Sequence, residues 1–331
     1  MKSTLSILAT VSTLALLSAC GSSGDSAPPP TGTQAVAITA TNQASVARAT
    51  VNGGLSLGLV QNETTNGAAV SPGSAAVAQH VLQRALTNAL NQRKSIASTT
   101  AQPAAGSSGT DACGVSGTLM STWNDVDNNS QLSAGDILTA NFQHCQDTST
   151  LSVNGLVTIT LTGTPTEQQF SANASFQSVA VVYGGITYTI NGSVALSETD
   201  TSTISSSTFT IGSAGLTVAI ASASYSDSIT FDPGFVSAST FLAGTSSLTV
   251  TGSFVSQSIG GRVTIATPQA LVEQPGDLEP RQGQVRITGA TGSTLLATVL
   301  NTSQVQLQVD ANGDGTIDGT TTVAWSALLP S

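Results

Sequence analysis

The feature that most constrains the fold is a regular alternation of apolar and small polar residues through the second half of the chain. It covers residues 153–162, 186–196, 248–255 and 305–309, where Ser, Thr, Asn or Gln separates the apolar positions. This period of two is typical of antiparallel strands that bury one face and expose the other. Asn-Gly dipeptides such as Asn191-Gly192 mark turns or bulges in these strands.

About ten to twelve strands of this kind fit between residues 111 and 327, and no second helical pattern offers crossover connections. We therefore predict a mostly β fold: an antiparallel meander that forms a sandwich or an open half-barrel, with one or two N-terminal helices. A propeller or solenoid is disfavoured because no repeat of fixed length appears. A membrane-spanning barrel is the less favoured alternative, because its aromatic girdles need more than 2 Trp, 3 Tyr and 8 Phe.

The N-terminal part of the chain has a different pattern. Residues 35–98 show helical spacing, with a short helix capped by Asn42 and ended by Gly53-Gly54, and a clearer helix over roughly residues 74–97. Residues 99–112 are rich in Ser, Thr, Ala and Gly and are interpreted as a linker. The antiparallel β-domain is then expected over residues 113–331.

The charge balance excludes one class of partner. The chain holds 8 Lys and Arg against 18 Asp and Glu, a formal net charge of −10 at pH 7. A nucleic-acid-binding protein needs a basic footprint, so this class is set aside. Ser and Thr together make up 94 of the 331 residues, so the solvent-facing side of the predicted sheet is expected to be rich in hydroxyl groups.

The first twenty residues have the organisation of an export signal. One lysine is followed by a mostly apolar run of thirteen residues, 5–17, and then by Ser18-Ala19-Cys20. That run is too short to span a bilayer as a helix. Leu17-Ser18-Ala19-Cys20 resembles the lipobox of bacterial lipoproteins. The resemblance implies that residues 1–19 are removed as a signal peptide and that Cys20 carries the lipid anchor.

The residues after Cys20 fit such an anchor. Residues 20–34 form a polar tether rich in Ser, Gly and Pro, with no helical or strand pattern. Gly21, and not Asp, follows the cysteine, which by the same resemblance favours delivery to the bacterial outer membrane. The expected partner is therefore a membrane, with the protein facing the periplasm or the cell surface.

A stretch of twelve residues, 125–136, resembles the calcium-binding loop of EF-hand proteins. Oxygen-bearing side chains stand at the alternate positions that point inwards in such a loop, and a carboxylate ends it. The expected ligands are Asp125, Asp127, Asn129, the backbone carbonyl of Gln131, Ser133 and Asp136. Two features depart from the pattern: position 6 is Ser130 instead of Gly, and Asp136 is shorter than the usual Glu. Because Asp and Asn are also common turn formers, a solvated turn without an ion is the alternative interpretation.

Two cysteines flank this loop. A hairpin centred on Asn129 would place Cys113 directly opposite Cys145 on neighbouring strands, at a distance suited to a disulfide. An oxidising compartment outside the cytoplasm also favours the bridge.

A second stretch near the C-terminus has the same character. Its oxygen-bearing side chains are Asp310, Asn312, Asp314, Thr316 and Asp318, and Gly315 stands at position 6. Position 12 is Thr321, so no carboxylate closes the shell there unless Asp318 does so. Calcium, in a structural role, is the one cofactor expected for the chain, and an ion-free turn is again the alternative.

Three features occur together in this chain: two cysteines around the first loop, a strand with an Asn-Gly dipeptide, and the second loop before Trp325. This combination resembles a group of uncharacterised, β-rich proteobacterial lipoproteins. The resemblance covers residues 113–162 and 282–328, and it implies location and fold without any activity.

No catalytic motif stands out in the chain. The two histidines, His80 and His144, belong to no metal-binding pair, and the nucleophile motif G-x-S-x-G is absent. We therefore expect no enzyme. Two functions are kept: a structural or interaction lipoprotein whose Ser- and Thr-rich sheet contacts an envelope protein, a polysaccharide or a lipid, and a periplasmic carrier of lipids or small apolar ligands with an open β-sheet cavity.

Overall fold

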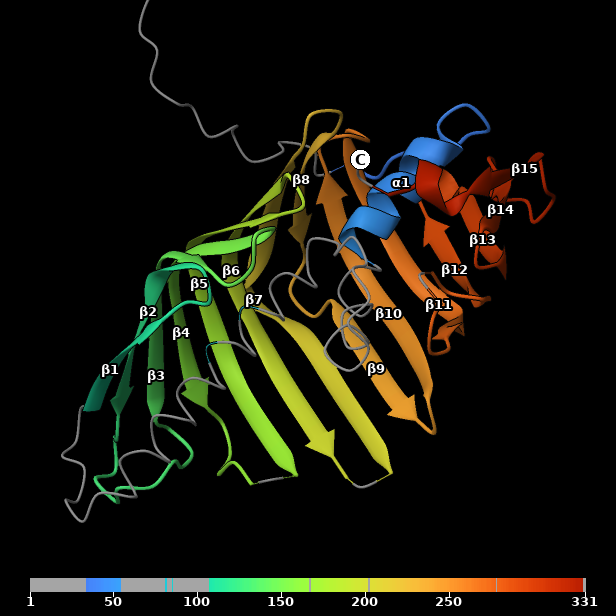
Figure 1. Ribbon diagram of the computed structural model, residues 1–331. Helices are drawn as coiled ribbons and strands as arrows, with labels where there is room; N and C mark the ends of the chain where they lie inside the picture. Colours follow the sequence, from blue (N-terminus) through green and yellow to red (C-terminus); the bar gives the residue numbers. More distant parts are fainter. Residues whose placement is uncertain are drawn as a thin grey trace, which may run out of the picture.

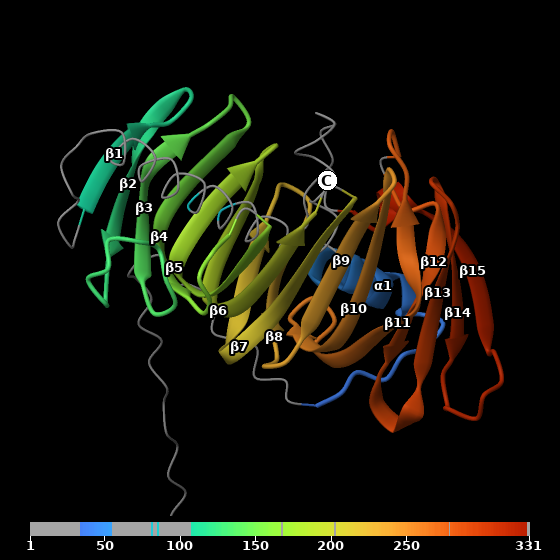
Figure 2. The same ribbon diagram turned by 90° about the horizontal axis from the view of Figure 1, so that it is seen from below.

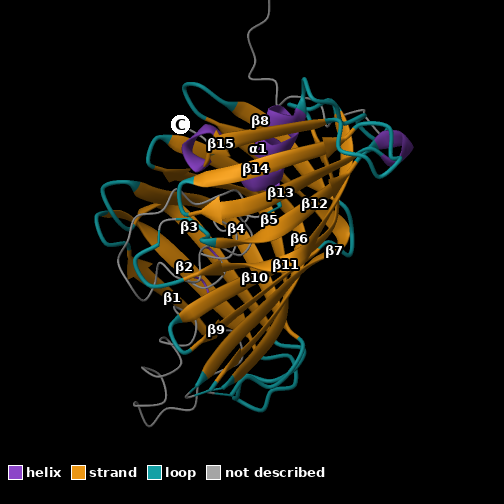
Figure 3. Ribbon diagram, turned by 90° about the vertical axis from the view of Figure 1, so that its right-hand side faces the viewer, coloured by secondary structure: helices purple, strands orange, loops and turns teal. Residues whose placement is uncertain are grey.

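A computed structural model of the chain describes residues 34–54, 81, 85, 107–166, 168–201, 203–277 and 279–329. Their dominant feature is one very large antiparallel sheet, which confirms the predicted mostly β meander (Figure 1). The sheet curves around its apolar face without closing into a barrel (Figure 2). It is also strongly twisted along its length, as the view in Figure 3 shows.

The described residues contain fifteen strands, more than the ten to twelve that the alternation predicted. Their bounds are β1 (Ser107–Ala112), β2 (Ser116–Asn124), β3 (Ile137–Gln146), β4 (Leu151–Leu161), β5 (Gln169–Tyr183), β6 (Ile186–Asp200), β7 (Ile204–Ala221), β8 (Ser226–Phe231), β9 (Val236–Leu242), β10 (Thr245–Ser256), β11 (Gly261–Glu273), β12 (Gln282–Thr288), β13 (Thr294–Asn301), β14 (Gln304–Asp310) and β15 (Gly319–Ala324).

Each strand pairs with the strands that precede and follow it, apart from one interruption. β8 and β9 together occupy the position of one strand in the sheet. The second half of β7 pairs with β8, and the first half of β7 pairs with β9. β10 likewise pairs with both. The break between β8 and β9 falls at Asp232-Pro233-Gly234-Phe235, where proline cannot donate a ladder hydrogen bond.

A line of β-bulges crosses the sheet and bends it. The register shifts between β2 and β3, β3 and β4, β4 and β5, β5 and β6, and β6 and β7. At Gly192 (φ +125°) an added Cβ would overlap the carbonyl oxygen of Gly215 on β7, and at Gly155 (φ +128°) it would lie 2.7 Å from Val179 Cα on β5. Glycine is required at these two points because the neighbouring bulge occupies the side-chain position.

The Asn of each predicted Asn-Gly dipeptide in a strand supports a bulge of the neighbouring strand. Asn154 Oδ1 accepts a hydrogen bond from the backbone N–H of His144 at 3.1 Å, and Asn191 Oδ1 accepts one from that of Ser178 at 2.8 Å. Both donors have a positive φ, 49° and 47°. The dipeptides therefore lie within strands β4 and β6 and stabilise the bend there; they do not form hairpin turns.

Helix α1 (Gln43–Gly53) packs on the inner, apolar face of the sheet, as Figures 1 and 3 show. It crosses several strands: Gln43 Nε2 donates to Thr321 Oγ1 of β15, and Gly53 lies against Ile229 of β8. The helix begins and ends as predicted, but Asn42 does not cap it. Its side chain bonds back to Thr39 and Ala37 instead.

The N-terminal segment shares its core with the sheet. Ile38, Val46, Val81 and Ala85 belong to the same buried apolar cluster as the strands, so the described part of residues 35–98 is not packed as a separate unit. The predicted linker is also shorter than expected, because β1 takes up residues 107–112 of it. The signal peptide, Cys20, the tether before Gln34, His80 and all of the predicted helix over 74–97 except Val81 and Ala85 lie outside the described residues.

Candidate functional site

The first acidic loop, residues 125–136, connects β2 to β3. The carboxylate oxygens of Asp125, Asp127 and Asp136 lie within 4.8 Å of one another. Asp136 is fully buried and Asp125 is 5% exposed, whereas Asp127 faces solvent. Three like charges at this spacing repel one another, so the cluster needs hydrogen-bond donors or a cation to hold it together.

Backbone amides supply many of those donors. The N–H of Ser130 donates to Asp125 Oδ2 at 2.6 Å, that of Asn129 to Asp127 Oδ1 at 3.1 Å, and that of Gln131 to Asn129 Oδ1 at 2.6 Å. The N–H of Val126 donates to Asp136 Oδ1 at 3.0 Å and so closes the loop. These bonds turn the side chains of positions 1, 3, 5 and 12 towards the interior of the loop.

Side-chain donors complete the arrangement around Asp136 and Asp127. The indole Nε1–H of Trp123 donates to Asp136 Oδ2 at 3.2 Å, and the Ser133 hydroxyl donates to Asp127 Oδ2 at 3.0 Å. Desolvation raises the pKa of Asp127, but the hydrogen bonds from Asn129 and Ser133 outweigh it, and the pKa lies below its usual value. Asp127 is therefore ionised at neutral pH, as a calcium ligand must be.

The second acidic loop, which connects β14 to β15, repeats this hydrogen-bond pattern. The N–H of Gly315 donates to Asp310 Oδ2 at 2.8 Å, that of Asp314 to Asn312 Oδ1 at 2.9 Å, and that of Thr316 to Asp314 Oδ1 at 2.7 Å. The N–H of Ala311 donates to Asp318 Oδ2 at 2.7 Å. Asp318 therefore closes the second loop as Asp136 closes the first, three residues earlier than the expected position 12.

The backbone of the two loops also matches position by position. Positions 4 and 6 have positive φ in both: Asn128 (57°) and Ser130 (62°) in the first loop, Gly313 (76°) and Gly315 (86°) in the second. The departure noted at Ser130 thus leaves the turn intact, at the conformational cost of a non-glycine residue in the left-handed region.

The loops differ in how far their carboxylates converge. Among the described residues Asp125, Asp127 and Asp136 form a three-carboxylate group within 4.8 Å, and the acidic residues of the second loop form none. Asn312, Asp314, Thr316 and Asp318 are all exposed. The hydrogen bond from Thr316 N–H, followed by that from Asn312, holds the pKa of Asp314 below its usual value. The first loop therefore offers the more compact set of oxygen ligands.

Comparisons of the chain with family models, with curated proteins and with solved structures found no match. None of the described helices is long and apolar enough to cross a membrane.

The predicted disulfide is present, but its place in the sheet differs from the prediction. Cys113 and Cys145 are bonded, with their Cα atoms 5.4 Å apart. The β2–β3 register pairs Trp123 with Leu138, so the hairpin is not centred on Asn129. Cys113 lies in the turn between β1 and β2, and the bridge ties this turn to β3. The bridge joins residues 32 positions apart. Closing a loop of this length lowers the entropy of the unfolded chain and adds about 3–4 kcal/mol to the free energy of unfolding.

The outer face of the sheet is the second candidate site. Its exposed positions form rows of hydroxyl groups, because paired residues on neighbouring strands point the same way. One row crosses β2 to β6 through Thr122, Thr139, Thr158, Ser175 and Ser193.

On strands β2 to β7, β9 and β10, below the line of bulges, this outer face carries no charged or aromatic residue, whereas the exposed Arg286 of β12 lies on the same face beyond them. Its positions on β2 to β7, β9 and β10, below the line of bulges, are Thr118, Met120, Thr122, Asn124, Ile137, Thr139, Asn141, Gln143, Leu156, Thr158, Thr160, Gln169, Ser171, Asn173, Ser175, Gln177, Ser193, Ala195, Ser197, Thr199, Ile204, Ser206, Thr208, Thr210, Val236, Ala238, Thr240, Leu242, Thr245, Ser247, Thr249 and Thr251. We call these residues the hydroxyl face.

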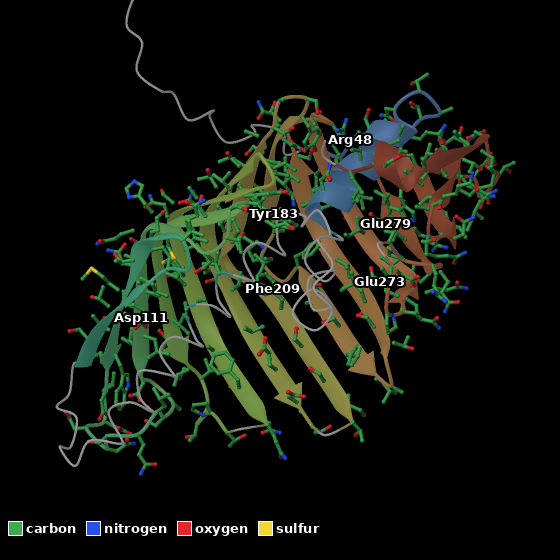
Figure 4. All side chains as sticks on the ribbon, viewed as in Figure 1. Arg48, Asp111, Tyr183, Phe209, Glu273 and Glu279 are labelled. Atoms are coloured by element: carbon green, nitrogen blue, oxygen red, sulfur yellow. A yellow bond between two sulfur atoms is a disulfide. The ribbon has the colours of Figure 1, made fainter. Side chains whose placement is uncertain are left out.

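The sequence reasoning missed three buried carboxylates: Asp227, Glu273 and Glu279. Asp227 is 5% exposed and accepts hydrogen bonds from Tyr225, Ser256 and Ser258, while the Arg48 guanidinium stacks 4.5 Å from the Tyr225 ring. This group ties α1 to the sheet. Burial raises the pKa of Glu279 to about 7. None of the three belongs to a sequence motif; the partners of Asp227 come from the turn before β8, the last residue of β10 and the turn that follows it. Figure 4 shows Arg48 and Glu279.

A small apolar cavity lies between α1 and the sheet. Its walls come from α1 (Ala47, Thr50 and Val51), from β11 to β14, and from Trp325 and Leu328. Its volume of about 10 Å³ leaves room for one water molecule at most.

Proposed function

We propose that the protein is a non-enzymatic lipoprotein of the bacterial cell envelope, anchored in the outer membrane through Cys20, that acts as a structural and interaction module. The observation that carries the interaction role is the hydroxyl face. A surface of this extent without a single charge favours a neutral, hydrogen-bonding partner over an ionic one. Its hydroxyl and amide groups are complementary to the hydroxyl groups of a neutral polysaccharide.

The proposal includes structural calcium in the two acidic loops. Three carboxylates within 4.8 Å, two of them buried, are the ligand type that Ca²⁺ prefers. Both oxygens of Asp125 and the Oδ1 atoms of Asp127 and Asp136 each accept one hydrogen bond and keep a second lone pair for an ion. The Oδ2 atoms of Asp127 and Asp136 each accept two hydrogen bonds. Calcium would hold β2 to β3 and β14 to β15 at the loops; it takes no part in chemistry.

The carrier of lipids or small apolar ligands is the second candidate, because the sheet is curved and open. Against it stands the burial of the inner face: Phe142, Phe176 and Phe209 are at most 3% exposed. Figure 4 shows Phe209 on the inner side of the curved sheet. The burial of these side chains, together with the cavity of about 10 Å³ found among the described residues, supports the interaction module over the carrier.

The test is binding of the purified soluble chain to neutral polysaccharide isolated from the host envelope. We expect Thr139→Arg with Thr158→Arg to weaken binding at least tenfold, because two charges would interrupt the row without touching the core. Thr320→Arg, on the exposed edge strand β15, is the matched control and is expected to bind as the wild type does. Equal binding by all three proteins, or no binding by any, would refute the interaction role.

A further inference from the structure

The sheet has two rims, because its turns alternate between the two ends of the strands. One rim carries residues 184–185, 222–225, 257–260, 289–293 and 311–318, and we call it the anchor-side rim. The opposite rim carries residues 125–136, 243–244 and 274–277. Figure 1 shows the first group at the upper ends of the strands and the second at the lower ends.

The chain enters the described structure at the anchor-side rim. Ala35 forms a parallel bridge with Arg262, the second residue of β11. The N–H of Arg262 donates to the Gln34 carbonyl at 3.0 Å, and the N–H of Val36 donates to the Arg262 carbonyl at 3.0 Å. The N–H of Ala290, in the turn between β12 and β13, donates to the Val36 carbonyl at 2.7 Å. Residues 34–36 are thus fixed to two turns of this rim.

The length of the segment before Gln34 sets how far this rim can lie from a lipid on Cys20. Residues 20–33 are rich in Gly, Ser and Pro. A flexible chain of that length has an end-to-end distance of about 20 Å. β10 has twelve residues and, at the rise of a strand, separates the two rims by about 40 Å. The tether can therefore bring the anchor-side rim to the bilayer far more readily than the opposite one.

From this geometry we infer that the anchor-side rim faces the lipid surface. The inference rests on the proposed anchor at Cys20. The strands then stand away from the membrane, and the opposite rim projects into the periplasm or the medium. The two acidic loops are separated by this arrangement: residues 311–318 lie on the membrane side and residues 125–136 on the distal side.

The test is energy transfer from a single fluorescent amino acid to a headgroup-labelled lipid. The full chain, acylated in its host, is reconstituted in vesicles of phosphatidylethanolamine and phosphatidylglycerol. The donor replaces Gln257 in one protein and Leu242 in the other. Both side chains are exposed, and they lie near opposite ends of β10. Equal melting temperatures of the two labelled proteins show that each one is folded.

We expect at least twofold higher transfer from position 257 than from position 242. Insertion of about 30 Gly and Ser residues after Ser26 should remove most of this difference, because the longer tether no longer fixes the distance. Equal transfer, or higher transfer from position 242, in a protein that carries the acyl group would overturn the inference and leave the anchor standing. A chain without an acyl group that does not associate with vesicles would overturn both.

Discussion

Single glycines decide how the sheet bends. Gly155 lies on β4 and Gly192 on β6, and at each of them the backbone of a bulge on the next strand occupies the space that a Cβ would need. Gly252 on β10 repeats this, with an added Cβ 2.7 Å from Phe235 Cα at the break between β8 and β9, and so does Gly283 on β12, where it would lie 2.6 Å from the Ala270 carbonyl oxygen. The curvature of a sheet this wide thus depends on a few residues without side chains.

Gly192→Ala tests this dependence. We expect a loss of about 3 kcal/mol or more in the free energy of unfolding, because φ is +125° and the new methyl group would overlap Gly215. Gly185→Ala is the matched control: its φ is +86°, but nothing lies within 4 Å of an added Cβ, so only the backbone term of about 1 kcal/mol applies. Urea unfolding measures both variants. Equal losses would show that steric contact at the bulge contributes nothing.

Glu279 makes stability depend on pH. Its folded-state pKa is about 7, above its ordinary value of 4.5, because the side chain is buried. Between these two values the folded state binds more protons than the unfolded state, so the contribution of Glu279 to stability is fully present below pH 4.5 and is lost as the pH rises through 7. This rise in the pKa of Glu279 corresponds to a loss on the order of 3 kcal/mol in the free energy of unfolding at high pH.

We therefore expect wild-type protein to lose more stability between pH 5 and pH 8 than Glu279→Gln does, by a difference on the order of 2–3 kcal/mol in urea unfolding. Asp277→Asn is the control. The Arg281 hydrogen bond lowers the pKa of Asp277, so this variant should keep the wild-type loss over that range. A wild-type and a Glu279→Gln profile that run parallel would contradict the assignment.

At the scale of elements, alternation was a sufficient guide wherever a strand buries one face. The segments predicted from it at 153–162, 186–196, 248–255 and 305–309 correspond to β4, β6, β10 and β14. β1 escaped prediction because its sequence, SSGTDA, holds a single apolar side chain, at Ala112, and that side chain is exposed. An edge strand of this kind buries no face and so leaves no period-two signal.

The register of the β2–β3 hairpin could not be predicted from the sequence. Symmetry about Asn129 assumed that the hairpin turns at that residue, but the strands pair Asn124 with Ile137 on either side of the loop, so the pairing is already displaced there. A bulge of β3 at His144 shifts the pairing again between Ser116 and Thr118. The disulfide still forms because Cys113 reaches β3 from the preceding turn. In the second loop the spacing left open whether Asp318 or no carboxylate closes the shell. Asp318 closes the loop through a hydrogen bond from the Ala311 N–H, which no motif encodes.

Calcium should stabilise the elements that the acidic loops connect. A ligand that binds only the folded state at a hundredfold excess over Kd adds about 2.7 kcal/mol, and extracellular-type sites have Kd of about 10⁻⁴–10⁻³ M. We expect millimolar Ca²⁺ to raise the Tm by several degrees and EDTA to lower it, as scanning calorimetry would record.

Substitutions in each loop test which of the two loops causes the calcium-dependent rise in Tm. Asp125→Ala with Asp127→Ala should abolish the part of the calcium-dependent rise in Tm that the first loop causes. Asp310→Ala with Asp314→Ala should abolish the part that the second loop causes. Asp200→Ala, an exposed aspartate outside both loops, should respond to calcium as the wild type does. A Tm indifferent to calcium and to chelator in every one of these proteins would leave both loops as ion-free turns.

At the scale of the whole molecule, the fifteen strands of the described residues form an open sheet with three regions. The inner face and α1 form the core, the hydroxyl face offers a neutral surface, and the anchor-side rim receives the tether. The division follows from alternation, since the residues that make the outer face polar leave the inner face apolar.

The most direct measurement is metabolic labelling with palmitate, in the host, of the wild-type chain and of Cys20→Ser, followed by membrane fractionation. We expect the wild-type protein to be labelled and to sediment with the outer membrane. Cys20→Ser should lose the label and leave that fraction. An unlabelled wild-type protein, or labelling and fractionation that persist unchanged in Cys20→Ser, would contradict the assignment of this protein as a lipid-anchored module of the envelope.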